Sequence, residues 1–154
     1  MQKLLFSIVL LLSLSNCFAS CNSKSQTSDP LINSTISNNK MKIKIGEKVF
    51  IATLNDSPTA KAFKALLPMT INMIELNNNE KYADLPKNLP TNASIPTSIL
   101  TGDLMIYGTN MLVLFYKTFS TRYSYANLGR IDDTTGLATA LGNGHVTVTF
   151  ELVK

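Results

Sequence analysis

The sequence predicts a mostly-β domain whose strands form a barrel or a sandwich. Many short segments alternate apolar and polar residues, which is the pattern of strands with one buried face. Only one segment has the spacing of a good helix, and strands do not alternate regularly with helices as they do in parallel α/β folds. The chain has 154 residues and no internal repeat, so we expect one domain. These observations favour a mostly-β architecture over the other fold classes.

The domain is predicted to open with a hairpin. Residues 41–45, MKIKI, alternate Met and Ile with Lys, as a half-buried strand does. Gly46, Glu47 and Lys48 follow as a turn, and residues 49–54 have the composition of the return strand.

A short helix is expected directly after this hairpin. Ser57 suits the N-cap position and Pro58 the first helical position. Apolar residues recur on one face of the turns that follow, and Pro68 prevents the helix from continuing. Residues 69–77 then predict a strand that ends at the Asn-rich turn 77–79.

The rest of the chain is predicted to combine connections, strands and one more short helix. Residues 80–103 contain three prolines and little periodicity, so we expect a long connection over the surface. Residues 104–118 predict a hairpin around Gly108, and residues 136–142 predict at most two turns of helix. The cleanest strand signal is in residues 145–153. The apolar positions that face one way in this strand are Val146, Val148, Phe150 and Leu152.

The charge of the predicted domain argues against a nucleic-acid surface. The whole chain has a formal net charge of +4, but from Met41 onward there are eleven Lys or Arg and nine Asp or Glu, a net of about +2. The basic residues are dispersed and form no run, so they make no electrostatic footprint for a polyanion. We therefore expect no nucleic acid among the partners.

The sequence contains no motif for a cofactor or a metal. His145 is the only histidine, and the predicted domain has no Cys that could join it as a ligand. There is no Gly-rich phosphate loop, no nucleophile elbow and no pair of carboxylates placed for acid–base catalysis. We predict neither a metal site nor a cofactor.

The N-terminal residues have the pattern of an export signal. One charge, Lys3, precedes an apolar run over residues 4–14, which is too short to span a bilayer comfortably. The sequence FASC, which ends at Cys21, resembles the lipobox of bacterial lipoproteins, and the resemblance implies lipidation of that cysteine. Cys17 is the competing site, and simple secretion with cleavage after Ala19 is the alternative.

These features divide the chain into three parts. Residues 1–20 are predicted to be a signal peptide, residues 21–40 a flexible tether, and residues 41–154 the folded domain. The tether is rich in Ser, Asn and Thr and has no aromatic residue, so it buries too little surface to offset its ordering entropy. We expect the protein in the bacterial cell envelope, held at the membrane only through a lipid anchor.

The order of four short motifs resembles the cyclophilin-like superfamily. TAKAF lies in the predicted helix, and TGDLMIYG, LVLFY and LGRI follow in that order. The resemblance covers residues 41–154 and is closest to the bacterial cyclophilin-like branch of poorly understood function. It implies a closed eight-stranded β-barrel capped by one or two short helices.

The sequence departs from the prolyl isomerases of this superfamily at the positions that carry their activity. Those enzymes place an arginine upstream of the Gly-Asp step, but no arginine precedes Gly102 here. Leu100 stands where they have a glutamine, the chain has no Trp, and His145 matches no family position. We therefore favour a binding module without isomerase activity. The alternatives are a peptidyl-prolyl isomerase with a rebuilt site and a structural accessory lipoprotein without a ligand.

A candidate site is centred on residues 115–130, which hold five of the twelve Phe and Tyr residues and both arginines. We assign Phe115 to the core that fills the barrel, and Arg130 to a structural or surface cation. Arg122 is the better ligand-binding candidate, because an arginine among aromatic side chains can stack and can donate to carbonyl or carboxylate groups. Arg122 and the tyrosines after it lack strand alternation, so we expect them on a loop at the rim of a groove. The groove is predicted to hold a peptide segment or a small molecule between Arg122, Tyr123, Tyr125, Tyr116, Tyr107 and Tyr82.

Overall fold

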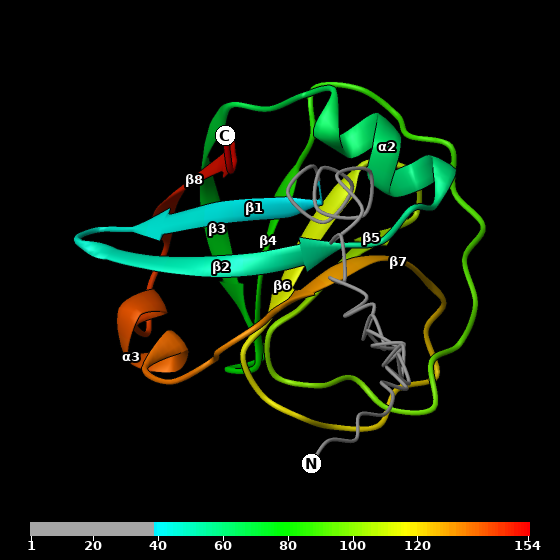
Figure 1. Cartoon of the computed structure of the whole chain (residues 1–154). Coiled ribbons are helices and arrows are strands. Elements are labelled where there is room, and N and C mark those ends of the chain that lie inside the picture. Colours follow the sequence, from blue (N-terminus) through cyan, green and yellow to red (C-terminus); the bar gives the residue numbers. More distant parts are fainter. Residues whose placement is uncertain (1–38) are drawn as a thin grey trace, which may run out of the picture.

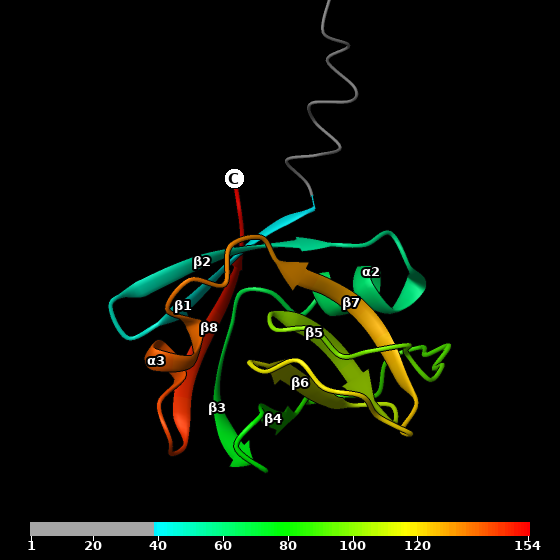
Figure 2. The same cartoon turned by 90° about the horizontal axis from the view of Figure 1, so that it is seen from below.

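The computed structural model describes residues 39–154, which form a closed barrel of eight antiparallel strands (Figures 1 and 2). Around the barrel the strands follow the order β1-β2-β7-β5-β6-β4-β3-β8, so the last strand pairs with the first. The predicted closed eight-stranded barrel with two short helices is thus confirmed. The elements are β1 (Lys40–Ile45), β2 (Lys48–Leu54), α2 (Pro58–Lys64), β3 (Met69–Leu76), β4 (Glu80–Asp84), β5 (Asp103–Tyr107), β6 (Met111–Phe115), β7 (Tyr125–Ile131), α3 (Leu137–Leu141) and β8 (Val146–Leu152).

The predicted signal peptide, the lipidation site Cys21 and almost all of the predicted tether lie outside the described residues. The strand β1 begins at Lys40, the last residue assigned to the tether, so the fold starts one residue earlier than predicted. Within residues 39–154, no helix has the length and apolar character needed to cross a membrane.

The residues predicted to form the first turn and the start of the helix have those roles in the structure. Gly46 has a φ of +57°, which a tight turn between β1 and β2 requires and which glycine adopts at low cost. The Ser57 side chain accepts a hydrogen bond from the backbone N–H of Ala60 at 3.1 Å, and Pro58 is the first residue of α2. The helix ends at Lys64, before Pro68.

Two strands were not predicted, and each has a physical reason. Residues 80–84 form β4 rather than the start of a long connection, with the charged Lys81 and the small Ala83 on the side that faces the barrel. A charged residue at an inward position removes the alternation that marks a strand. Residues 125–131 form β7, where the pairing with β5 shifts register between Leu104 and Met105, so the alternation breaks there too.

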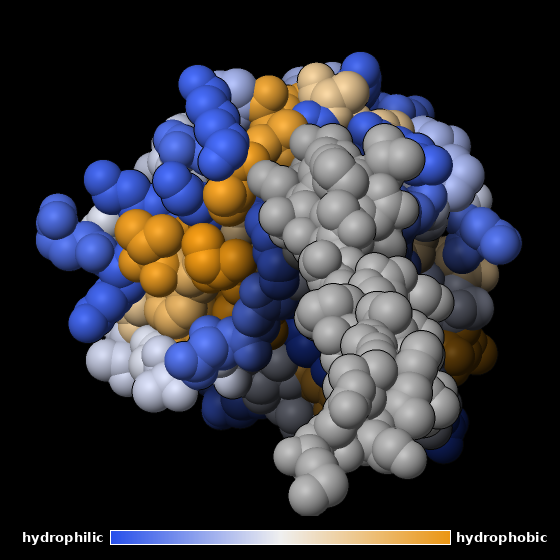
Figure 3. Space-filling model, in the orientation of Figure 1, coloured by the Kyte–Doolittle hydropathy of each residue, from blue (hydrophilic) through white to orange (hydrophobic). Residues whose placement is uncertain are grey.

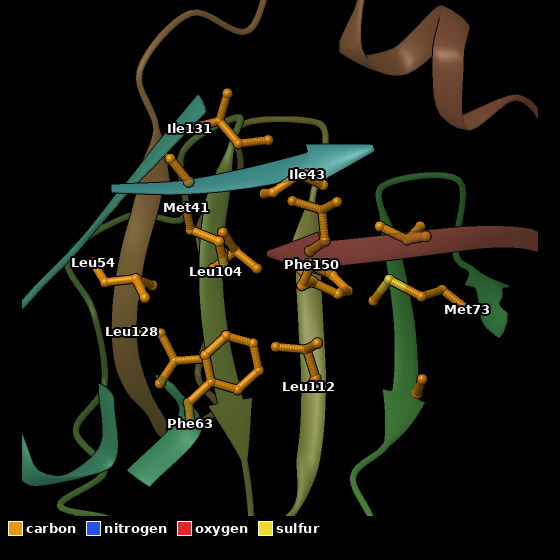
Figure 4. Close-up of a cluster of buried hydrophobic side chains, with 14 of the residues drawn as sticks. Met41, Ile43, Leu54, Phe63, Met73, Leu104, Leu112, Leu128, Ile131 and Phe150 are labelled. Carbon is orange, nitrogen blue, oxygen red and sulfur yellow. The ribbon is translucent and has the colours of Figure 1, made fainter. Parts of the chain in front are cut away.

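All eight strands contribute apolar side chains to the barrel interior, shown in Figure 4. We call this set the interior cluster. The helices α2 and α3 lie at opposite ends of the barrel (Figures 1 and 2) and add Phe63 and Leu137, respectively. The rings of Phe63 and Phe150 meet edge to face, with their centroids 6.1 Å apart. The residues labelled in Figure 4 are Met41, Ile43, Leu54, Phe63, Met73, Leu104, Leu112, Leu128, Ile131 and Phe150.

One charged side chain is fully enclosed near the end of the barrel at α3. Lys81 has no exposed surface and forms an ion pair with Glu75. Its Nζ atom also donates to the backbone carbonyls of Gly142 at 2.8 Å and Gly144 at 2.7 Å. The three donors of the ammonium group are therefore satisfied, as a buried cation requires. The Tyr116 hydroxyl lies 2.9 Å from both Glu75 carboxylate oxygens and donates to that carboxylate.

Two motifs of the family resemblance meet at the pairing of β5 with β7. The buried Asp103 accepts a hydrogen bond from Arg130 Nε at 2.6 Å and another from the Leu100 N–H at 2.8 Å. At Gly129, with φ +151°, a Cβ atom would lie 2.1 Å from the Thr53 carbonyl oxygen, so only glycine allows β7 to approach β2 this closely. Arg130 is accordingly a structural cation.

The surface seen in Figure 3 is mostly hydrophilic, with apolar side chains gathered near the β1–β2 hairpin. Val49, at the start of β2, is among the exposed large apolar residues.

Candidate functional site

A second apolar cluster lies on the outside of the barrel wall formed by β4, β6, β5 and β7. Along these strands, alternate side chains point away from the interior. We call the buried set the outer cluster; its members are Ile99, Met105, Val113, Phe115 and Tyr125. The outer face of the wall is therefore built as a second, smaller core.

Two connections cover this outer cluster and run side by side (Figure 1). Residues 85–102 and residues 116–124 are joined by backbone hydrogen bonds between Ile99 and Phe119 at 2.9 and 3.1 Å. Ser94 is joined in the same way to Tyr125, at the start of β7. The rings of Phe119 and Tyr125 contact Phe115 with centroid distances of 5.7 and 5.5 Å. The long connection thus has a structural role, because it closes the outer cluster.

Beside the outer cluster lies an open hollow of about 790 Å³. The β3–β4 turn, β4, the β5–β6 hairpin, β7 and residues 119–123 all contribute to its lining. Its volume falls in the range of about 300–1,000 Å³ typical of small-ligand sites. The aromatic residues that line it are Tyr82, Tyr107, Phe119, Tyr123 and Tyr125.

Three tyrosines form a connected aromatic wall in this hollow. The Tyr107 ring lies 6.0 Å from Tyr123 in an edge-to-face arrangement and 5.5 Å from Tyr125 in a tilted one. Tyr123 is 62% exposed and stands at the rim, whereas Tyr125 is buried. Tyrosine combines an apolar ring with a polar tip, so such a wall can contact both apolar and polar parts of a ligand.

The structure places five of the six residues predicted for ligand binding around this one hollow. They are Tyr82, Tyr107, Arg122, Tyr123 and Tyr125. Tyr125 was expected on a loop with Arg122, but it begins the strand β7. Arg122 lies in the connection before β7, is exposed, and has no hydrogen-bond or ion-pair partner within residues 39–154.

The sixth residue, Tyr116, does not line the hollow, and Tyr116 and Phe115 each lie on the side of the barrel wall opposite to the one predicted. Leu112 and Leu114 of β6 face the interior, so Phe115 faces outward and joins the outer cluster instead of filling the barrel. Tyr116 comes two residues after Leu114, so the same alternation places it on the inner side, where its hydroxyl donates to Glu75. Both side chains are buried, but on opposite sides of the barrel wall.

Among the polar lining residues that were not predicted, Glu80 and Asn79 stand out because they lack hydrogen-bond donors in the described part of the chain. Glu80 is only 8% exposed, and its carboxyl group has no hydrogen-bond donor or ion-pair partner within residues 39–154. Burial, together with the nearby charge of Glu75, raises the pKa of Glu80 to about 7. The Asn79 Oδ1 atom is also buried and accepts no hydrogen bond from the described residues. The Asn-rich turn at 77–79 could have pointed to these two residues. A turn after one strand predicts a returning strand, and Asn79 and Glu80 lie where that strand begins.

The hydroxyl groups near Glu80 stay protonated in the physiological range. Burial and the charge of Glu80 raise the pKa of Tyr125 to about 12. Burial and the hydrogen bond to Glu75 raise the pKa of Tyr116 to about 12. Within residues 39–154, no three His, Cys, Asp or Glu side chains are grouped so that they could hold a metal ion. The hollow therefore offers aromatic surface, neutral hydroxyl groups and unpaired acceptors.

The model of the cyclophilin-like family matches residues 43–151, which is most of the chain and all but the ends of the barrel. The chain belongs to the cyclophilin-like family. No curated protein matches this cyclophilin-like protein.

A solved structure with a similar fold is the solution structure of a hypothetical protein from Archaeoglobus fulgidus. Its TM-score is 0.51 with 15% sequence identity, and the similarity covers 75% of this chain and 95% of the archaeal one. At this identity the likeness concerns the fold. It shows that the barrel of this cyclophilin-like protein has a counterpart in an archaeon.

Proposed function

We propose that this protein is an exported, lipid-anchored cyclophilin-like binding module that holds a peptide segment or small ligand in the tyrosine-lined hollow. The observation that carries this proposal is the hollow itself, which gathers four tyrosines from separate parts of the chain. Concave sites of this size, mostly apolar and with a few polar groups, are typical of ligand binding.

A second, smaller hollow supports a peptide over a compact ligand. It has a volume of about 430 Å³ and lies between the start of α2, the connection at 90–94 and β7. Tyr125 lines both hollows. An extended ligand that crosses Tyr125 would contact both. In the second hollow Asn55 donates to Asn127, which leaves the Asn127 side-chain N–H groups to donate to the ligand's backbone.

An isomerase with a rebuilt site is the second candidate, and Arg122 is the observation in its favour. Arg122 lines the main hollow, and its guanidinium group has no partner within residues 39–154, whereas the isomerases use an arginine from upstream of the Gly-Asp step. We expect no isomerase activity, because the glutamine position holds Leu100 and no Trp is present. The spontaneous exchange takes tens to hundreds of seconds, so a prolyl peptide assay resolves acceleration easily. Acceleration at low micromolar protein, lost in Arg122→Ala, would favour the isomerase.

Export and anchoring are supported by the N-terminal sequence. We expect Cys21→Ala to release the protein from the membrane fraction or to stall its processing, with Cys17→Ala as the matched control. Unchanged membrane association and mass in Cys21→Ala would remove the lipoprotein part of the proposal without affecting the binding part.

Thermal unfolding with a ligand panel tests the binding function. A ligand that binds only the folded state raises the melting temperature, and the rise grows with the logarithm of the ligand concentration above Kd. We expect a subset of peptides to raise the Tm of the wild type, and Tyr123→Ala to reduce that rise while leaving the ligand-free Tm nearly unchanged. If no member of a broad panel of peptides and small molecules shifts the Tm, the structural accessory role replaces the binding role.

A further inference from the structure

We propose that the hollow recognises a positively charged arginine or lysine side chain of the bound peptide, an inference that rests on the proposed binding function. The main argument is that the hollow contains acceptors that lack donors. Buried polar groups in folded proteins are nearly always paired. Glu80 and the Asn79 Oδ1 atom, both in the lining, have no hydrogen-bond donor within residues 39–154.

The aromatic wall provides a second, independent preference for a cation. The Tyr107 ring contacts the rings of both Tyr123 and Tyr125 in the same hollow that contains Glu80. The face of an aromatic ring attracts ammonium and guanidinium groups, most strongly where water is excluded. A guanidinium group is planar, stacks on such rings and carries five N–H donors. It can therefore satisfy the two acceptors and contact the tyrosines at once, which a neutral apolar side chain cannot do.

The charges around Glu80 do not neutralise it within the described residues. Lys81 follows Glu80 on β4, but its side chain faces the interior, where its ammonium group bonds to Glu75 and two backbone carbonyls. Glu75 on β3 adds a second negative charge that disfavours ionisation of Glu80.

Arg122 lines the hollow as an exposed side chain, and its charge is screened by solvent. Its guanidinium group is available for a backbone carbonyl or carboxylate of the same peptide. The Tyr125 hydroxyl lies near Glu80 in the hollow, and the Tyr116 hydroxyl lies on the inner side of the wall, where it donates to Glu75.

A titration with matched peptides tests the inference on the full chain. The probes are acetyl-Gly-Gly-X-Gly-Gly-amide with X as arginine, lysine, citrulline, norleucine or proline, and Kd is measured from NMR shifts at pH 8. Citrulline keeps the length and the planar head of arginine but has no charge. We expect the arginine peptide to bind at least about tenfold more tightly than the citrulline peptide, as charge-assisted hydrogen bonds and ring contacts require.

Glu80→Gln is the decisive variant, because it keeps the shape of the side chain and removes the charge. We expect it to reduce the preference for arginine over citrulline to about twofold, while Glu47→Gln in the exposed β1–β2 turn leaves the preference unchanged. In the wild type the preference should weaken at pH 5.5, where the Glu80 carboxyl holds its proton. Tyr123→Leu, which keeps an apolar side chain at the rim, should reduce arginine binding more than norleucine binding.

The outcomes separate this inference from the binding function itself. Equal Kd values for arginine and citrulline, or an unchanged preference in Glu80→Gln, would overturn the cation inference. Binding of the norleucine or proline peptide alone would overturn it too, while leaving the proposed binding function intact. If none of the five peptides binds at millimolar concentration, the inference fails, and the ligand panel described above then decides the binding function separately.

Discussion

The interior cluster and the outer cluster differ in whether the polar side chains beside them have hydrogen-bond partners. In the interior cluster the apolar side chains of all eight strands pack together, and the enclosed cation Lys81 is paired with Glu75 and two carbonyls. In the outer cluster the packing stops at an open hollow, and Glu80 and Asn79 are left without donors among the described residues. The same strands build both regions, because successive side chains alternate between the two faces of the wall.

The difference is what we expect if the interior only stabilises the fold and the outer face also serves as the proposed binding site. A sequence that only had to fold would pair or replace a buried carboxyl group, because an unpaired one costs free energy. Proteins break such local rules mainly where function requires it. The unpaired acceptors beside the tyrosine wall are therefore the strongest sign that the outer face is a site.

The largest expected effect is the loss of an aromatic side chain from the interior. Phe150→Ala should lower the free energy of unfolding by about 3–5 kcal/mol, because Phe150 is fully buried and contacts Phe63. Phe115→Ala should cost about 3 kcal/mol, at the lower end of this range, since the outer cluster is smaller and can collapse beside the hollow. Urea unfolding of both variants measures the difference. A greater loss for Phe115→Ala would mean that the outer cluster is the principal core.

The buried ion pair gives the next effect. Lys81→Met should cost about 3 kcal/mol, because it leaves Glu75 and the carbonyls of Gly142 and Gly144 without their donor. Lys48→Met, at an exposed position of β2, is the control and should stay within about 0.5 kcal/mol of the wild type. Equal stabilities for the two variants would show that the enclosed network contributes nothing.

Glu80→Gln should stabilise the protein at high pH. The pKa of about 7 in the folded state exceeds the ordinary 4.5, so between these values the folded protein binds more protons than the unfolded chain. Stability therefore falls as pH rises from about 4.5 to 7 and stays lower above that. At pH 8 we expect the variant to gain about 1–3 kcal/mol, and at pH 4 almost nothing. Thermal and urea unfolding across pH measure this, and a variant less stable than the wild type at pH 8 would refute the cost assigned to Glu80.

The smallest expected effect is at Arg122. Arg122→Ala should change the free energy of unfolding by no more than about 0.5 kcal/mol, because the side chain is exposed and has no partner within residues 39–154. It should nevertheless weaken binding to the hollow that Arg122 lines. If Arg122→Ala destabilises the protein as much as Phe115→Ala, the arginine belongs to a structural network and the predicted ligand contact is wrong.

Much of the fold could be predicted because its signals are local. Alternation in β1 and β8, the Ser57 and Pro58 pair at the start of α2, and Gly108 between β5 and β6 each depend on neighbouring residues. The strand β4 could not be recognised in this way, because its inward Lys81 is tolerated only through contacts from β3 and the α3–β8 connection. Those contacts join residues far apart in the chain.

The candidate site was harder to predict from local sequence signals than the fold. The tyrosines and Arg122 could be collected from composition, but the side of the wall that a strand residue occupies depends on the register of its strand. Alternation in β6 places Leu112, Leu114 and Tyr116 on the inner side and Phe115 on the outer side. The segment LVLFY does not indicate which side is which, because its residues are apolar or aromatic on both faces. Glu80 carries no sequence signal of its own, since its importance comes from being largely buried without a partner among residues 39–154. Burial of that kind is a property of the three-dimensional arrangement.

Mapping a bound peptide by NMR tests most directly whether the outer face is the binding site. The full chain labelled with ¹⁵N is titrated with the tightest-binding peptide, and backbone amide shifts are followed. We predict shifts at Tyr82, Tyr107, Tyr123 and Tyr125 and almost none at the interior residues Ile43, Val148 and Phe150. Shifts confined to another surface, such as the β1–β2 hairpin, would contradict the account.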